Sequence, residues 1–211
     1  MEMSFVNEDD VIEIVEELLI KIFKEIKAIS LNPGFNRISY KESMNRFGND
    51  RPDLRFGLEH QTITNIFKNT EFKVFKGVVE SKGIIKCIKV ENATMTRKNI
   101  DELTTYAQEH GAKGLAWIKV LDSELQSPIL KFFTEEEIDS LKNQLKLKVG
   151  DIVFFGAGDE EVVNNYMSAV RNKLGKDLGL IKPNSYEFVW ITDFPLFLKI
   201  DDKVTSTHHP F

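Results

Sequence analysis

A short charged loop contains the first residues whose types could do chemistry. Between residues 48 and 55 the side chains are mostly ionic or amide around one proline, and Asp50, Arg51, Asp53 and Arg55 place both signs of charge close together. Such a stretch does not build a core, so we expect a loop. Two readings stay open: a structural ion-pair network, or an active-site or domain-junction loop that orients these charges.

His208 and His209 form the one histidine pair of the sequence. A metal site needs ligands that converge on one ion, whereas adjacent side chains of an extended chain point in opposite directions. No nearby Cys or His pair completes a ligand set, so we predict no metal site. Either the pair belongs to a frayed tail, or its imidazoles contact a substrate carboxylate or phosphate.

The segment Gly156-Ala157-Gly158 lies where a phosphate-binding loop would, after an expected strand and before an expected helix. Glu161 occupies the place of the third glycine of the dinucleotide fingerprint, and Asp159 and Glu160 add negative charge where a phosphate would bind. We therefore expect a tight strand-to-helix turn.

The remaining candidates are isolated side chains. Cys87 is the only cysteine, which excludes a disulfide framework and a thiolate-rich zinc site, and its apolar neighbours predict a small buried side chain. His60 and His110 stand at polar positions without a suggestive neighbour. We assign no catalytic residue.

Composition limits the function classes. The chain has 211 residues, with 28 Lys and Arg against 33 Asp and Glu, a formal charge of −5 that argues against a tight nucleic-acid binder. No apolar run approaches the ~20 residues of a membrane span, and no signal-peptide pattern opens the sequence. We expect a cytoplasmic protein without a membrane contact.

The elements that would position these residues follow from periodicity. Apolar residues at three- and four-residue steps predict a long helix over 7–29, and a capping box at Ser39 and Glu42 predicts a short helix ending at Gly48. Further on, strands are expected at 72–79, 83–90, 115–121, 151–155 and 187–192, and helices at 96–111, from 134, and at 159–174. A hairpin over 72–90 and this order predict an α+β unit, an antiparallel sheet with helices on one face.

Three segments are expected. Residues 64–183 form the α+β unit, and residues 1–63 and 184–211 flank it. Neither flank could bury its apolar face alone, so we expect the flanks to pack on each other, with the middle unit as an insertion between them.

Several blocks together resemble bacterial aspartyl-tRNA synthetases, in the order that this family shows. Arg46–Arg55 resembles their YGSDKPDLR junction, and Leu103–Val120 is similar to the signature of their inserted GAD domain. The other similar blocks are Phe154–Ala157, Leu174–Leu180, Trp190–Phe197 and His208–Phe211.

The resemblance implies a fold for each segment. The insert would be a GAD domain, a DCoH-like two-layer antiparallel sheet, and the flanks would be parts of a class II catalytic core. The sequence has no Phe-Arg-x-Glu, and no Gly-x-Gly-x-Gly run followed by Arg, which hold ATP in that class. The anticodon-binding barrel is also missing. We therefore expect a fragment that is inactive alone, because the triphosphate clamp supplies most of the catalysis.

The resemblance also implies partners and site residues. The parent enzyme would use ATP and Mg, bind aspartate and tRNA, and form a homodimer. His208 would help to hold aspartate, with His209 as its neighbour, and Asp50, Arg51, Asp53 and Arg55 would position the insert or line the site. The alternatives are a standalone GAD-type tRNA-associated binding module without ligase activity, and a structural α+β protein that shares only the fold.

Overall fold

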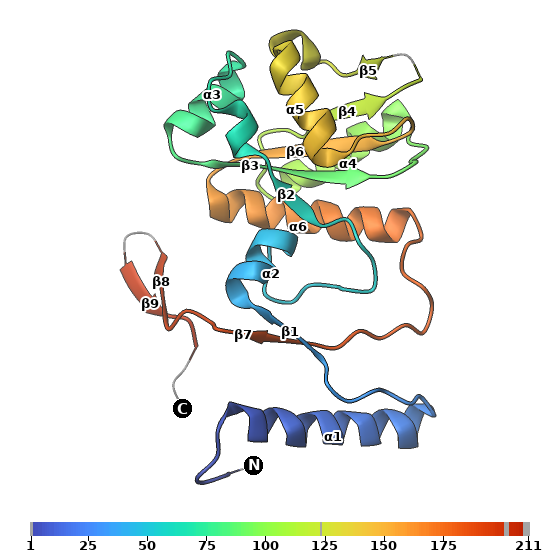
Figure 1. Ribbon diagram of the computed structural model, residues 1–211, viewed down its shortest axis with the longest axis vertical. Coiled ribbons are helices and arrows are strands. Elements are labelled where there is room, and N and C mark those ends of the chain that lie inside the picture. The colour runs from blue at the N-terminus through green and yellow to red at the C-terminus, as the bar shows by residue number, and fades with distance from the viewer. Residues whose placement is uncertain (1, 123, 201–202, 209–211) are drawn as a thin grey trace.

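The computed structural model describes residues 2–122, 124–200 and 203–208. Its elements form an elongated arrangement, with a helix-covered sheet at one end and the long helix α1 (Glu8–Lys27) at the other (Figure 1). In the described residues, no helix combines the length and apolarity that crossing a membrane requires.

The main sheet is antiparallel and has five strands. Their order is β2 (His60–Thr62), β3 (Ile84–Val90), β6 (Ile152–Gly158), β4 (Ala116–Val120) and β5 (Leu125–Gln126). The α+β class and the antiparallel sheet are thus confirmed.

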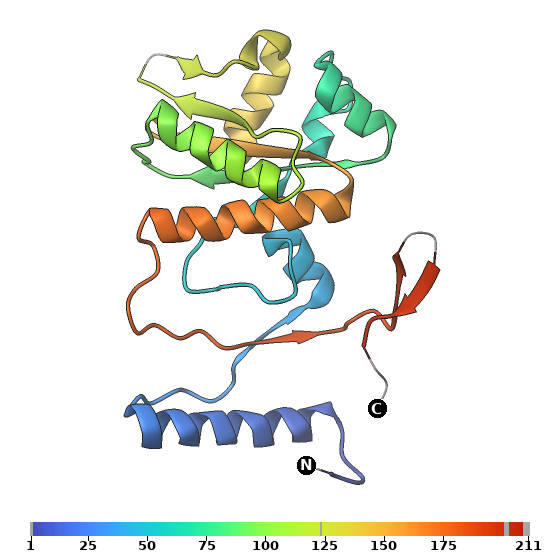
Figure 2. The same cartoon turned by 180° about the vertical axis from the view of Figure 1, so that it is seen from behind.

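Helices cover both faces of this sheet, not one as expected. α4 (Arg97–Glu109) and α6 (Glu160–Asp177) pack on one face, and α3 (Lys73–Glu80) and α5 (Glu135–Leu145) pack on the other (Figures 1 and 2). The central strand β6 begins with a continuous apolar run rather than an alternating one, and such a run is typical of a strand buried on both faces.

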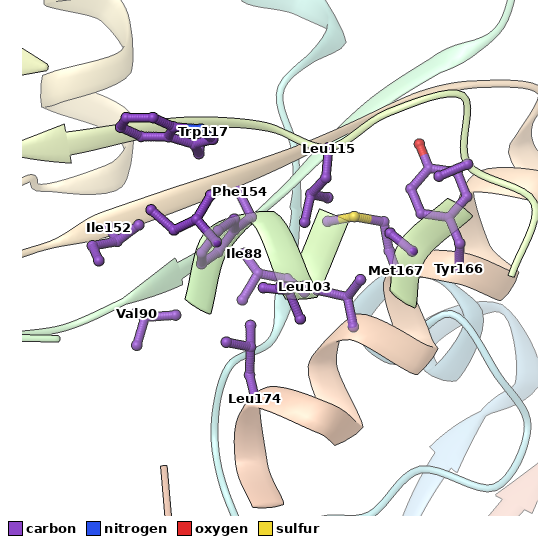
Figure 3. Packing of buried hydrophobic residues seen from close by; sticks show 14 of the residues in the cluster. Ile88, Val90, Leu103, Leu115, Trp117, Ile152, Phe154, Tyr166, Met167 and Leu174 are labelled. Carbon is purple, nitrogen blue, oxygen red and sulfur yellow. The ribbon is translucent and has the colours of Figure 1, made fainter. Parts of the chain in front are cut away.

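The core between the sheet and helices α4 and α6 is the larger of two clusters. Figure 3 shows sheet side chains, Ile88 and Phe154 among them, packed on Leu103 of α4 and on Met167 of α6. The other members labelled there are Val90, Leu115, Trp117, Ile152, Tyr166 and Leu174. The second cluster, on the opposite face, includes Cys87, which is fully buried as predicted and whose pKa burial raises to about 12.

The strand predicted over 72–79 is wrong, because this segment forms helix α3. Phe75 and Val78 are three residues apart and both pack in the same core cluster, whereas a strand would place them on opposite faces. The predicted hairpin is therefore absent, and β3 pairs with β2 and β6 instead. β2 is a strand of three residues that the pattern missed.

The opening segment continues from α1 through β1 (Asn36–Ser39) into α2 (Tyr40–Phe47). α1 and α2 confirm the two helices predicted there. Asn7 caps α1, and Ser39 caps α2, which ends at Gly48 in the left-handed conformation. The 3-10 turns Thr64–Phe67 and Leu130–Phe132 complete the helical elements of the described residues.

The closing segment packs on the opening one, as expected. β7 (Val189–Thr192) pairs in parallel with β1, and an antiparallel hairpin of β8 (Phe197–Ile200) and β9 (Lys203–Ser206) follows. Phe23 of α1 makes edge contacts with Tyr186 and Phe188. The segment boundaries at 63 and 183 stay predictions.

One buried carboxylate joins these pieces. Glu16 of α1 accepts hydrogen bonds from the backbone N–H groups of Gly34 (2.7 Å) and Phe35 (3.0 Å), and from Nε1 of Trp190 in β7 (2.9 Å). This carboxylate therefore links α1 to both the opening and the closing segment.

Candidate functional site

The charged loop predicted over residues 48–55 follows α2 in the structure, and we call residues 48–57 the junction loop. It begins at Gly48, whose φ of +73° and close approach to α6 both require glycine, since a Cβ there would lie 2.5 Å from the backbone oxygen of Asn164. The hydroxyl of Ser43 donates to the carbonyl of Asn49 (2.6 Å), and Nδ2 of Asn49 contacts the hydroxyl of Ser168. α2 and α6 thus fix the start of the loop.

The four charges of the junction loop divide into two pairs. Arg55 donates to both oxygens of Asp53, from Nε at 2.8 Å and from Nη2 at 2.6 Å, and this bond holds the pKa of Asp53 below its usual value. Asp50 and Arg51 lie 3.7 Å apart, and the Arg51 side chain is 94% exposed. Asp53 and Arg55 therefore form a structural pair, and Asp50 and Arg51 have the freedom to meet a ligand.

Arg171 of α6 lies fully buried beneath the junction loop. Its Nη2 donates to the carbonyls of Asp53 (2.8 Å), Phe56 (2.9 Å) and Gly57 (2.8 Å). Its guanidinium also lies 4.2 Å from the ring centroid of Phe56 and 4.8 Å from that of Phe47. Sequence reasoning missed this residue, although its place among the apolar positions of α6 was a signal.

A second buried cation, Lys86 of β3, joins the sheet to α2. Its Nζ donates to the carbonyls of Met44 (2.9 Å) and Asn45 (2.9 Å), and to Oδ1 of Asn164 in α6 (2.7 Å). The carbonyl end of a helix attracts a cation. Sequence reasoning missed Lys86 as well, although a lysine inside the apolar run around Cys87 was a signal.

His60, which stands at a polar position in the sequence, is buried in the structure. Only 5% of the residue is exposed, because β2 is paired with β3 and the ring packs beside Gly48. Neither ring nitrogen has a hydrogen-bond partner among the described residues. Burial, with a contribution from the charge of Lys86, lowers the pKa of His60 to about 3, so the ring is neutral near pH 7.

His208 follows the β8–β9 hairpin and is exposed. Its ring lies 4.8 Å, centroid to centroid, from Phe194, which in turn lies 5.0 Å from Tyr40 at the start of α2. The N–H of Thr207 donates to the carbonyl of Leu196 (3.1 Å) and holds the turn. His209 lies outside the described residues.

Tyr40 and Phe194 link His208 to the start of α2, and we call them the aromatic bridge. Burial raises the pKa of Tyr40, and the negative charges of Asp50 and Glu161 add to that rise. Among the described residues, no hydrogen bond or ion pair joins His208 to residues 50–55 directly. An imidazole, a carboxylate and a guanidinium are each groups that can bind a small zwitterionic or anionic ligand.

Two further sequence candidates have structural roles. Gly156 lies in β6, where a Cβ would come within 2.6 Å of Met167, so its glycine is required for packing against α6. Asp159 caps α6 by accepting from the N–H of Glu161 (3.0 Å), which agrees with the expected strand-to-helix turn. Within the described ranges, no group of three or more His, Cys, Asp or Glu side chains could hold a metal ion.

Comparison with known protein families matches residues 75–167 to the GAD domain. This match includes α3, which the sequence pattern misread, and most of the five-stranded sheet.

Similarity to curated proteins extends over the whole chain. It is 48% identical over 212 residues to the aspartate–tRNA(Asp/Asn) ligases of Aquifex aeolicus and of a Hydrogenobaculum species, and 45% identical over 214 residues to the aspartate–tRNA ligase of Clostridium botulinum. Each match covers 100% of this chain but only 35% or 36% of the relative. The chain thus spans about a third of the length of these ligases.

Proposed function

We propose that this chain is a segment of an aspartate–tRNA ligase, which activates aspartate with ATP and transfers it to tRNA. The observation that carries the proposal is the 45–48% identity over the entire chain, flanks included. A standalone GAD-type binding module predicts similarity confined to the region of residues 75–167. The flanks, which supply His208 and the junction loop, are instead similar to ligases as well.

Within this enzyme, His208 is proposed to help hold the aspartate substrate. Its imidazole is exposed and is oriented by the contact with Phe194. A neutral or protonated imidazole can donate a hydrogen bond to a carboxylate. His209 is proposed as its neighbour in the same role, and Asp50 and Arg51 as groups that line the site across the aromatic bridge.

ATP and Mg belong to the proposed reaction, but the described residues do not fit them. Their carboxylates form no cluster of three with other ligand side chains, and the sequence lacks the two arginine motifs that clamp ATP in class II synthetases. We therefore assign no step of ATP chemistry to this chain and expect it to be inactive alone.

The decisive experiment compares the longer gene product containing this segment with the 211-residue chain. Aspartate-dependent exchange of pyrophosphate into ATP reports adenylate formation. We expect exchange with the longer protein and none with the short chain. If the longer protein showed no exchange, or exchange that did not depend on aspartate, and the short chain bound tRNA tightly, the binding module would be favoured instead.

His208 is tested in the longer protein. We expect His208→Ala to raise the KM for aspartate about tenfold or more, because a charge-assisted hydrogen bond contributes about 1.5–3 kcal/mol. His110→Ala is the control, since Nδ1 of His110 contacts the carbonyl of Tyr106 within the GAD domain. An unchanged KM for aspartate in His208→Ala would remove the substrate role.

The remaining partners follow from the same proposal. The longer protein is proposed to bind tRNA, to form a homodimer and to work in the cytoplasm, where tRNA is charged for translation. The net charge of −5 leaves the tRNA contact of this segment without a strong electrostatic basis.

A further inference from the structure

The contacts of Arg171 point to a link between helix α6 and the proposed substrate site. α6 covers one face of the sheet and lies within the predicted insert, yet all three hydrogen bonds of Arg171 go to the junction loop. The acceptors are backbone carbonyls at residues 53, 56 and 57, so this one side chain fixes the path of the loop rather than any one of its side chains.

Burial of the Arg171 guanidinium is not expected to stabilise the fold. It is fully buried, but its Nε and Nη1 have no hydrogen-bond partner among the described residues. The nearby carboxylates bond other arginines, Asp53 bonding Arg55 and Glu59 bonding Arg46. Burying a charge without a paired carboxylate is costly, and an apolar side chain of similar volume often gives equal or better stability.

The contacts of Arg171 instead hold the junction loop in one conformation. Phe47 and Phe56 hold the guanidinium plane from the end of α2 and from the loop itself. Nη2 then sets the position of the carbonyl of Asp53, whose side chain holds Arg55. Residues 50 and 51 lie between this anchor and the Asn49–Ser168 contact at the loop's start.

We propose that Arg171 is a positioning residue through which helix α6 holds Asp50 and Arg51 in place at the proposed aspartate site. The proposal rests on the proposed function for its consequence in catalysis. Its structural part, control of the loop by Arg171, stands on the contacts alone.

The structural part is tested by hydrogen exchange on the 211-residue chain. We expect Arg171→Met to speed exchange of amides in residues 48–57 about tenfold or more, while β3 and β6 keep their protection. Arg171→Lys retains the charge but not the planar stacking, and we expect partial recovery of loop protection. Lys173→Met, on the same helix but paired with Asp177, is the matched control.

Trypsin gives a second readout of local opening in the loop. The Arg55–Phe56 bond lies within the anchored part of the loop, and cleavage there should become faster in Arg171→Met and stay slow in Lys173→Met. Loop protection and cleavage equal to wild type in Arg171→Met would overturn the proposal. So would equal loosening of the loop and the sheet in both Arg171 variants, because this is the signature of a purely structural role.

The catalytic consequence is measured in the longer protein by aspartate-dependent pyrophosphate exchange. We expect Arg171→Met to reduce kcat/KM for aspartate about tenfold at a temperature where the protein is fully folded, since small misplacement of a positioned group costs this much. Arg171→Lys should recover part of the loss. Full activity in Arg171→Met despite a loosened loop would overturn the catalytic role. If the wild-type longer protein shows no exchange, the proposed function fails, and the loop measurements still decide the role of Arg171.

Discussion

Basic side chains are buried where α2, the junction loop and α6 meet. Lys86 donates to backbone carbonyls and an amide, Arg171 donates to backbone carbonyls through Nη2 alone, and His60 is neutral beside them. None of the three has a carboxylate partner among the described residues. The joint between flank and insert therefore depends on the protonation of these groups in a way that an apolar joint would not.

His60 makes stability dependent on acid. Its pKa is about 3 in the folded chain and 6.5 as a free side chain, so the unfolded state binds more protons between these values. The contribution of neutral His60 is complete above pH 6.5 and is lost as pH falls toward 3. We expect the free energy of unfolding of wild type to fall by up to about 1.4 kcal/mol per pH unit more steeply than that of His60→Gln.

The measurement is urea unfolding of both proteins at intervals from pH 7.5 to 4. His110→Gln serves as the control, because His110 lies at the end of α4, away from this joint. Parallel pH profiles for wild type and His60→Gln would contradict the lowered pKa, because they would mean that His60 binds its proton equally well in the folded and unfolded states.

At the scale of elements, sequence patterns succeeded where local chemistry decides the structure. Side-chain caps at Asn7 and Ser39 define the starts of α1 and α2 without help from distant residues. Residues 72–79 were misread because a short apolar run fits a strand and a helix equally, and tertiary contacts of Phe75 selected the helix. The continuous apolar run of β6 already indicated a strand buried on both faces, and hence helices on both sides of the sheet.

The turn between α2 and the junction loop predicts a sharp mutational effect. We expect Gly48→Ala to lower the free energy of unfolding by roughly 2–4 kcal/mol, because strain at positive φ adds to a backbone clash with Asn164. Gly34→Ala is the matched control: its φ is +80°, but nothing lies within 4 Å of the added Cβ. We expect a loss of about 1 kcal/mol there.

Chemical denaturation of the two variants separates conformational strain from steric clash. Equal losses in Gly48→Ala and Gly34→Ala would mean that α6 moves aside without cost, and that the junction loop is not fixed at its start.

At the scale of the whole molecule, the candidate site was only partly accessible from sequence. The charges of the junction loop and His208 were visible through their resemblance to a family. The aromatic bridge was not, because Tyr40 and Phe194 are far apart in the chain and meet only when β1 pairs with β7. Arg171 and Lys86 stand out in sequence only as basic residues among apolar ones, and their partners, mainly backbone carbonyls distant in the chain, could not be read from it.

The carboxylate of Glu16 holds α1 against the rest of the flanks. Removing it tests whether α1 can detach while the sheet stays folded. Glu16→Ala leaves the N–H groups of Gly34 and Phe35 and Nε1 of Trp190 without their acceptor. We expect faster hydrogen exchange in residues 8–27 and 34–35, with unchanged protection in β3 and β6. Glu17→Ala, an exposed neighbour, is the control. Loss of protection in the sheet as well would mean that flank and insert unfold as one cooperative unit.

The parallel pairing of β1 with β7 has a topological consequence. Two adjacent parallel strands must be joined by a crossover, and here everything from residue 40 to residue 188 forms that crossover. α2 follows β1 directly and contacts β7, so it already provides the helix of a simple β–α–β unit. The sheet-containing domain is then an insertion in this crossover, and its length could change in evolution without altering the pairing of β1 with β7.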